Sequence, residues 1–237
     1  MQQYNRILIK LSGESLMGST GNIFDAITLD IILNQIKNLT NLGIKIGIVI
    51  GGGNIFRGIN GDKLGLQRAN ADYMGMLATI MNGIALKDFL ESHGVKSKIY
   101  SALAVGNIIK GYNRDSMLKR MDDGNVIIFV GGTGNPFFTT DSGAALRAIE
   151  MNADILIKAT KVDGVFDKDP AQYSDAIKHE KLSFDAAINA NLKVMDMSAF
   201  DLCRANNMNL VVCNIFKPHS LERVVRGENE GTFVYCT

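Results

Sequence analysis

The sequence predicts an α/β fold in which a mostly parallel central sheet is sandwiched by helices on both faces. Three observations support this: the strand-like runs are continuously apolar, they alternate with runs of helical periodicity, and several end in glycine-rich turns. Continuous apolar strands are typical of parallel sheets buried on both sides. No Pro- or Ser-rich linker divides the 237 residues, so we expect a single domain over 1–237, in one or two lobes around a cleft.

The first half of the chain contains three predicted strands and two predicted helices. Arg6–Leu11 and Ile44–Ile50 are apolar runs of strand length, and Lys98–Ala102 is a shorter one. Asp25–Asn41 has apolar residues three or four apart, which predicts a helix. Gln67–His93 predicts a long helix, whose apolar side is expected to carry Met74, Leu77, Ile80, Met81, Ile84, Leu86 and Phe89.

The second half continues the alternation. Asn113–Met121 predicts a helix ended by Gly124, and Asn125–Val130 predicts a buried strand. Asp141–Met151 predicts a helix with Asp141 at its start, before a strand at 154–159. The remaining predicted elements are short helices near Ser183–Asn189 and Ser198–Asn206, a strand at Leu210–Cys213, a helix at Pro218–Arg226 and a strand at Thr232–Cys236.

Composition argues against several classes of protein. A formal net charge of +1 gives no basic field for sequence-independent binding to nucleic acid. Three histidines lie far apart, which argues against a metal site of their own, and three cysteines form no CxxC pair. The apolar runs are shorter than the roughly 20 residues of a membrane span. With no signal-like region before the first strand, we expect a soluble cytoplasmic enzyme.

Four predicted strands end in glycine-bearing turns: Ser12–Glu14, Gly51–Gly53, Gly131–Asn135 and Thr160–Gly164. Each turn alone is explained equally well by chain reversal. Ligands of open α/β sheets, however, bind beyond the carboxyl ends of the strands, where these turns are expected to meet. Four of them at one edge therefore favour a ligand site.

The glycine turns do not fit the two common phosphate motifs. No glycine is followed by lysine, which excludes a P-loop, and no GxGxxG fingerprint is present. Three lysines do lie at strand ends, namely Lys10, Lys158 and Lys161. Oriented N–H groups and cations are what the transition state of phosphoryl transfer requires, so phosphoryl transfer is the chemistry that this pattern favours.

Four segments of the sequence, in this order, are KLSGESL, IVIGGGNIFRG, FVGGTGNPFFTTDSGAALRAIEMNAD and KATKVDGVFDKDP. Together they resemble the amino acid kinase family over essentially the whole chain. The piece GTGNPFFTTD is similar to members that phosphorylate UMP, and separates the chain from the acetylglutamate, aspartate and carbamate kinases. The resemblance implies transfer of the ATP γ-phosphoryl group to UMP, giving UDP and ADP, with Mg²⁺.

The resemblance also implies roles for individual residues. The expected ATP-binding residues are Lys10, Leu11, Ser12, Gly13, Gly53, Arg57, Thr160, Phe166 and Asp169. The expected UMP-binding residues are Gly52, Asp72, Thr133, Gly134, Asn135, Pro136, Phe137, Phe138, Thr139 and Thr140, with Asp72 at the ribose hydroxyls. The expected catalytic residues are Lys10, Asp141 and Lys161. Magnesium is expected mainly on the ATP phosphates, without a metal site of the protein's own.

The residues themselves leave some alternatives open. Lys10 lies in a buried strand, where an unpaired cation is costly, and this favours a catalytic over a structural role. Asp72 would by itself be interpreted as a carboxylate near a helix start. Asp141 fits both a helix N-cap and a group that orients the lysines or Mg²⁺. Arg68, Arg114 and Lys119 are predicted on solvated faces.

Regulation and assembly rest on the resemblance alone. It implies a homohexamer, and GTP and UTP as effectors at a loop formed by Gly18, Ser19, Thr20, Gly21, Asn22 and Ile23. That loop has the family's glycines but lacks its acidic residue. Its alternative interpretation is a flexible hairpin before the first helix.

Two other functions are compatible with the fold. A phosphotransferase of the same family that acts on a carboxylate or carbamate would be expected to have a cation in the acceptor loop. Gly131–Asp141 contains no lysine or arginine. A nucleotide-sensing or molybdenum-storage-like binding protein would be expected to lack the phosphate lysines, and Lys10 is present.

Overall fold

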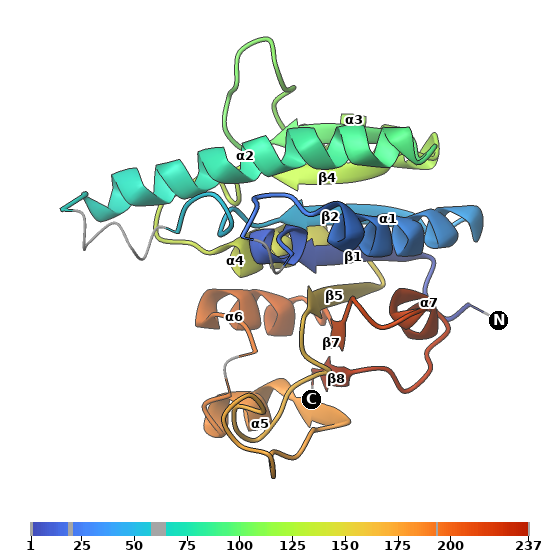
Figure 1. Cartoon of the computed structure of the whole chain (residues 1–237), viewed down its shortest axis with the longest axis vertical. Coiled ribbons are helices and arrows are strands. Elements are labelled where there is room, and N and C mark those ends of the chain that lie inside the picture. The colour runs from blue at the N-terminus through green and yellow to red at the C-terminus, as the bar shows by residue number, and fades with distance from the viewer. Residues whose placement is uncertain (1, 19–20, 58–64, 193, 237) are drawn as a thin grey trace.

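Eight strands form the core of the molecule. The computed structural model describes residues 2–18, 21–57, 65–192 and 194–236. The strands are β1 (Arg6–Leu11), β2 (Lys45–Ile50), β3 (Ser97–Ser101), β4 (Val126–Val130), β5 (Ile155–Thr160), β6 (Lys181–Ser183), β7 (Leu210–Asn214) and β8 (Thr232–Tyr235). They make one sheet in the order β3-β4-β2-β1-β5-β7-β8-β6 (Figure 1). The predicted α/β class with a mostly parallel sheet is confirmed.

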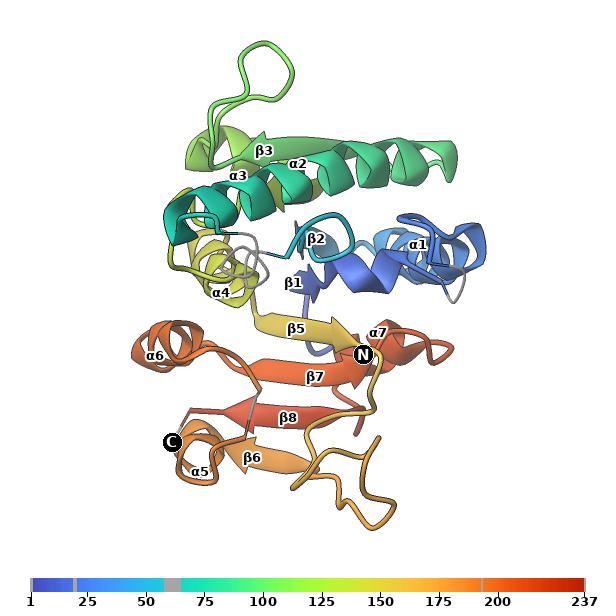
Figure 2. The same ribbon diagram turned by 60° about the vertical axis from the view of Figure 1, so that its left-hand side comes forward.

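The six strands from β3 to β7 in this order run parallel, and β8 pairs antiparallel with β7. Figure 2 shows β8 and β6 pointing opposite to β5 and β7. In the centre of the sheet, Lys10 of β1 is the register partner of Lys158 of β5. Neighbouring residues in register point to the same face of a sheet, so the fold places these two side chains next to each other.

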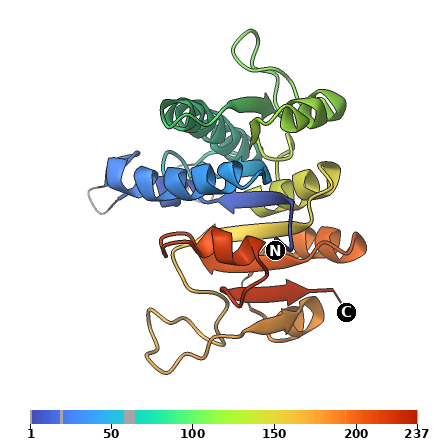
Figure 3. The ribbon, with the colours of Figure 1, turned by 90° about the vertical axis from the view of Figure 1, so that its right-hand side faces the viewer.

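Seven α-helices and one 3₁₀ helix are described. They are η1 (Gly13–Leu16), α1 (Ala26–Asn41), α2 (Arg68–Ser92), α3 (Arg114–Asp122), α4 (Thr140–Glu150), α5 (Phe184–Asn189), α6 (Met197–Ala205) and α7 (Ser220–Val225). One apolar cluster joins α1, α2 and α7 to one face of the sheet, and a second joins α3, α4, α5 and α6 to the other. The two helical layers flank the sheet in Figure 3. No helix among the described residues is long and apolar enough to cross a membrane.

Every predicted helix and strand is present, with ends shifted by one or two residues. Two elements were not predicted: η1, a single turn directly after β1, and β6, a strand of three residues at the edge of the sheet. Both are too short to produce a periodic pattern.

Helix α4 begins at Thr140 and is capped by the Thr139 hydroxyl, so of the two roles left open for Asp141 the N-cap is wrong.

The predicted apolar side of α2 is wrong in part. Ile80 and Leu86 face the core. The helix is apolar around most of its circumference, and its other apolar face is solvent-exposed. That outer face is made by Tyr73, Met74, Leu77, Met81 and Ile84, whose exposed fractions lie between 38% and 55%. The inner face combines the large apolar residues Met76, Ile80, Leu86 and Leu90 with small and polar ones, including Ala78, Thr79, Asn82 and Gly83.

Candidate active site

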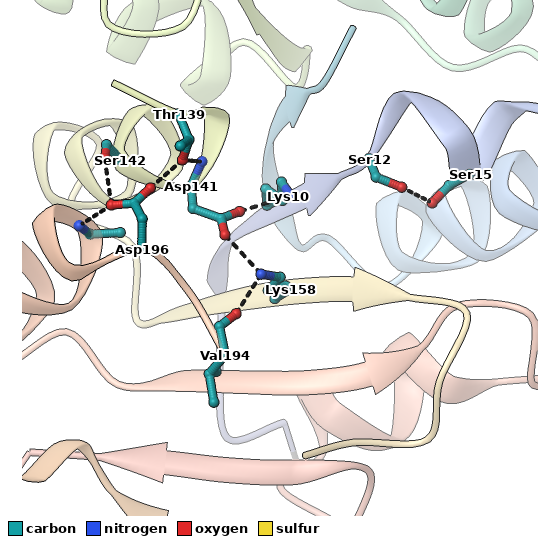
Figure 4. Close-up of polar contacts among 10 residues, drawn as sticks. Lys10, Ser12, Ser15, Thr139, Asp141, Ser142, Lys158, Val194 and Asp196 are labelled. Carbon is teal, nitrogen blue, oxygen red and sulfur yellow. Dashed lines mark hydrogen bonds and ion pairs between the residues drawn. The ribbon is translucent and has the colours of Figure 1, made fainter. Parts of the chain in front are cut away.

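A buried charged cluster lies at the carboxyl end of the two central strands. Lys10 Nζ is 2.8 Å from one oxygen of Asp141, and Lys158 Nζ is 2.7 Å from the other (Figure 4). The two lysines are fixed by the β1–β5 register, and Asp141 by the first turn of α4. Lys158 also donates to the Val194 carbonyl. The cluster therefore carries two cations and one anion, a net positive charge.

The carboxylate of Asp141 is what allows both lysines to stay at this place. Burial alone would raise the pKa of Asp141, but the ammonium groups of Lys10 and Lys158 outweigh burial and hold that pKa below its usual range. Burial, together with the like charge of Lys10, lowers the pKa of Lys158 although Asp141 opposes this. The arrangement can present a concentrated positive charge to an anion that arrives from solvent.

The second lysine that pairs with Asp141, besides Lys10, is Lys158, which was not among the expected catalytic residues. Lys161, which was, lies exposed just beyond the end of β5. The two lysines differ in where they lie relative to β5. Lys158 lies within the strand and points to the same face of the sheet as Lys10, whereas Lys161 follows the last residue of the strand.

Asp196 is a second acid that the sequence analysis missed. It accepts hydrogen bonds from the hydroxyls of Thr139 and Ser142, at the start of α4, and from the backbone N–H of Ala199 (Figure 4). It therefore caps α6 and at the same time ties α6 to the helix that carries Asp141. The sequence Asp-x-x-Ala before an apolar run predicts a helix N-cap. The contact of Asp196 with Ser142, however, spans 54 residues of the chain and leaves no local pattern.

One cavity, of about 530 Å³, lies on the β5 side of the cluster. Its lining includes Lys158 and three of the expected ATP-binding residues, Thr160, Phe166 and Asp169. The Asp169 carboxylate accepts from Ala171 N–H at 2.9 Å and thereby shapes its own turn. We call this the β5 cavity.

A second cavity, of about 300 Å³, lies on the other side of the cluster, between α2 and the turns after β2 and β4. We call it the α2 cavity. Most of the expected UMP-binding residues line it, namely Gly52, Asp72, Thr133, Asn135, Phe138, Thr139 and Thr140. Gly53, expected at ATP, also lines it. Gly134, Pro136 and Phe137 belong to the same loop but do not line it.

Asp72 is engaged inside the molecule. Its carboxylate accepts from Arg68 Nε at 3.0 Å and from the backbone N–H of Phe137 at 2.8 Å. It is past the first turn of α2, whose N-cap is Gln67, so it does not cap the helix. Arg68 lines the α2 cavity beside Asp72, which corrects its predicted place on a purely solvated face.

The remaining expected ATP residues surround the turns after β1 and β2. Arg57 pairs with Glu14, which joins the two turns, and both side chains are about half exposed. Ser12 shares a 2.8 Å hydrogen bond with Ser15 (Figure 4). Leu11 is fully buried, and its carbonyl accepts from the N–H of Gly51 at 2.9 Å, so the expected contact of Leu11 with ATP is not supported by exposed surface. In the expected effector loop, Ser19 and Thr20 lie outside the described residues.

Comparisons with known proteins identify the family of this chain. The sequence model of the amino acid kinase family matches residues 5–214. The crystal structure of UMP kinase from Bacillus anthracis is 39% identical, with a TM-score of 0.94, over 98% of this chain and 96% of that one. UMP kinase from Ureaplasma parvum is 39% identical with a TM-score of 0.91, over 98% and 99%. Uridylate kinase from Archaeoglobus fulgidus is 25% identical with a TM-score of 0.73, over 99% and 100%. The chain belongs to the amino acid kinase family.

Proposed function

We propose that this protein is an ATP-dependent UMP kinase that serves pyrimidine nucleotide biosynthesis, with residues 1–237 acting as one domain. The observation that carries the proposal is the Lys10–Asp141–Lys158 cluster, which separates two cavities of nucleotide dimensions. The similarity to two UMP kinases at 39% identity supports UMP as the acceptor. The β5 cavity would hold the ATP nucleoside, and the α2 cavity would hold UMP.

The reaction follows from this placement. An oxygen of the UMP phosphate attacks the γ-phosphorus of ATP, and the bond from that phosphorus to the β–γ bridging oxygen breaks, which leaves ADP and UDP. Lys10 and Lys158 would offset the charge on the transferring group and on the leaving oxygen. Asp141 would not take a proton, because its pKa is held low; it would keep both lysines in place. Lys161 is exposed after the end of β5, so any contact it makes with the phosphates would be separate from this cluster.

The glycine turns complete the phosphate surface. Backbone N–H groups at Gly13 and at the turn after β2 would supply hydrogen-bond donors to phosphate. Arg57 would contribute a guanidinium once a phosphate competes with Glu14 for it. Asp72 would accept the ribose hydroxyls of UMP.

Magnesium would arrive with ATP. Mg²⁺ prefers oxygen ligands, yet both carboxylate oxygens of Asp141 are already engaged by lysines. This fits an ion held mainly by the nucleotide phosphates, whose chemistry is to neutralise charge between the β- and γ-groups. GTP and UTP stay as candidate effectors on the strength of family resemblance.

Assembly into a homohexamer is part of the proposal. The outer face of α2 exposes Met74, Leu77 and Met81 on adjacent turns. Contiguous apolar surface of this kind is typical of contacts between subunits. We place the protein in the cytoplasm, as befits free thiols at Cys203, Cys213 and Cys236.

The alternatives predict different acceptors. A carboxylate kinase needs an unpaired cation in the acceptor site, and Arg68, which lines the α2 cavity, is already paired with Asp72. A binding protein without catalysis would not need two buried lysines held by one carboxylate. Neither alternative accounts for the charged cluster as directly as phosphoryl transfer.

The test is a coupled assay of ADP release with ATP, Mg²⁺ and one acceptor at a time: UMP, CMP or acetylglutamate. A site that pairs with the uracil edge leaves buried groups unpaired against cytosine, so we expect kcat/KM for UMP to exceed that for CMP by about a thousandfold. Comparable values for UMP and CMP would contradict selection of the base. Turnover with acetylglutamate alone would overturn the proposal.

A further inference from the structure

The glycine turn after β2 is held by a buried amide on α2. Asn82 is fully buried, and its Nδ2 donates to the Gly51 carbonyl at 2.7 Å. The same nitrogen donates to Asn54 Oδ1 at 2.7 Å, and Asn54 Nδ2 donates back to Asn82 Oδ1 at 3.1 Å. The two side-chain amides thus hydrogen-bond to each other, and Asn82 also binds the carbonyl of Gly51, the first residue of the turn.

Three segments of the site meet at this amide pair. Asn54 Nδ2 also donates to the Ile23 carbonyl at 3.1 Å, just before α1. A Cβ added at Gly13 would lie 2.3 Å from Asn54 Oδ1 and 2.9 Å from the Gly51 carbonyl oxygen, so the turn after β1 packs directly on the pair. A Cβ at Gly52 would lie 2.7 Å from the Gly75 carbonyl of α2. The turn after β2 therefore has little room to move.

The preceding turn of α2 contacts the glycine turn after β4. The N–H of Gly131, directly after β4, donates to the buried Thr79 hydroxyl at 2.8 Å. Thr79 and Asn82 are three residues apart and therefore share one helix face. One face of α2 thus sets the backbone of both glycine turns that border the α2 cavity.

We propose that Asn82, through Gly51 and Asn54, is a positioning residue that sets the distance between donor and acceptor phosphates. The inference rests on the proposed function, in which backbone N–H groups of the turn that Gly51 begins approach the phosphates. Asn82 touches neither nucleotide cavity, so it acts through the turn and not on the substrates. Because a reaction between two bound groups is sensitive to misplacement of about 1 Å, loosening this turn would slow the chemical step.

The test is steady-state kinetics of the full-length protein with ATP and UMP for Asn82→Leu, a change that keeps the branched shape of the side chain but removes its donor and its acceptor. We expect kcat to fall about 10-fold to 100-fold, with both KM values within about threefold, because the nucleosides bind elsewhere. The matched control is Leu86→Ala, on the same inner face of α2 and fully buried, away from the glycine turn. It should lower thermal stability at least as much and keep kcat within about threefold.

Asn54→Ala and the double variant complete the design. If the two amides act as one unit, Asn54→Ala lowers kcat in the same way, and Asn54→Ala/Asn82→Leu is no worse than the more damaged single variant. Asn54 is only part-buried, so its variant also tests the idea should Asn82→Leu not fold. A folded variant with kcat within twofold of the parent, or multiplicative effects in the double variant, overturns the inference. Failure of the proposed function is visible separately, as an unmodified protein that does not phosphorylate UMP.

Discussion

The charged cluster and the α2 cavity lie side by side and are built in opposite ways. The cluster takes its lysines from two paired central strands, and its three side chains are each less than one-fifth exposed. The α2 cavity takes its polar groups from a helix and a loop, and Phe138 in its lining is about half exposed. The lysine charges are therefore fixed by the sheet, whereas the groups that would select the acceptor lie on a helix and on an exposed loop.

This contrast predicts where substitutions act. A change in the cluster should act on the chemical step, because its geometry does not depend on the substrate. A change in the α2 cavity should act on the choice of acceptor.

Lys10→Ala and Lys158→Ala should each lower kcat by about 100-fold or more, since each removes a cation worth a few kcal/mol to the transition state. Both variants should fold, because alanine leaves no unpaired charge on the strand. Lys161→Ala is the discriminating comparison, and we expect it to lower kcat by less than about fivefold, because Lys161 lies outside the cluster. The measurement is kcat at saturating ATP and UMP, with circular dichroism as a check of folding. Near-normal turnover of Lys158→Ala, or an equal loss in Lys161→Ala, would show that the cluster is not the catalytic centre.

Asp141→Asn should lower kcat by about 10-fold to 100-fold and also change its pH dependence. The carboxylate raises the pKa of Lys158 against burial and against the charge of Lys10. Without it that pKa falls further, so the ammonium loses its proton at lower pH and activity is lost earlier as pH rises. We expect the alkaline limb of the kcat profile to move down by about one pH unit or more. An alkaline limb that stays in place would mean that Asp141 does not act through the lysines.

The same contrast explains what could be predicted from the sequence. Strands and helices were predictable because their apolar periodicity is local, and Lys10 stood out as a cation in an apolar strand. The second lysine that pairs with Asp141 could not be predicted, because choosing Lys158 over Lys161 requires knowledge of the β1–β5 register. Asp196 and Asn82 were missed for a related reason. Ser142, bonded to Asp196, lies 54 residues away along the chain, and Gly51, bonded to Asn82, lies 31 residues away, so no local pattern marks these contacts with the site.

Asp72→Asn tests whether the α2 cavity selects the acceptor. An amide accepts ribose hydroxyls less well than a carboxylate, so kcat/KM for UMP should fall about 10-fold, and the preference for UMP over deoxy-UMP should shrink. Loss of Arg68 pairing is a competing cause, since Arg68 donates to the same carboxylate. Arg68→Ala is therefore the control, and it should leave the UMP to deoxy-UMP ratio unchanged. If Asp72→Asn also leaves that ratio unchanged, its carboxylate does not contact the ribose.

Arg57→Lys should have the smallest effect, about a fivefold loss in kcat/KM for ATP with kcat nearly unchanged. Arg57 is about half exposed and paired with Glu14, so a phosphate has to compete with a carboxylate for it. An ammonium keeps the charge but cannot form the two parallel hydrogen bonds of a guanidinium, so part of the interaction is lost. Arg57→Ala should lose more than Arg57→Lys, and Glu14→Gln, which releases the guanidinium, should not lower kcat/KM for ATP. Unchanged kinetics in both Arg57 variants would make the pair a surface contact only, and the phosphate site would then consist of the buried lysines and the glycine turns alone.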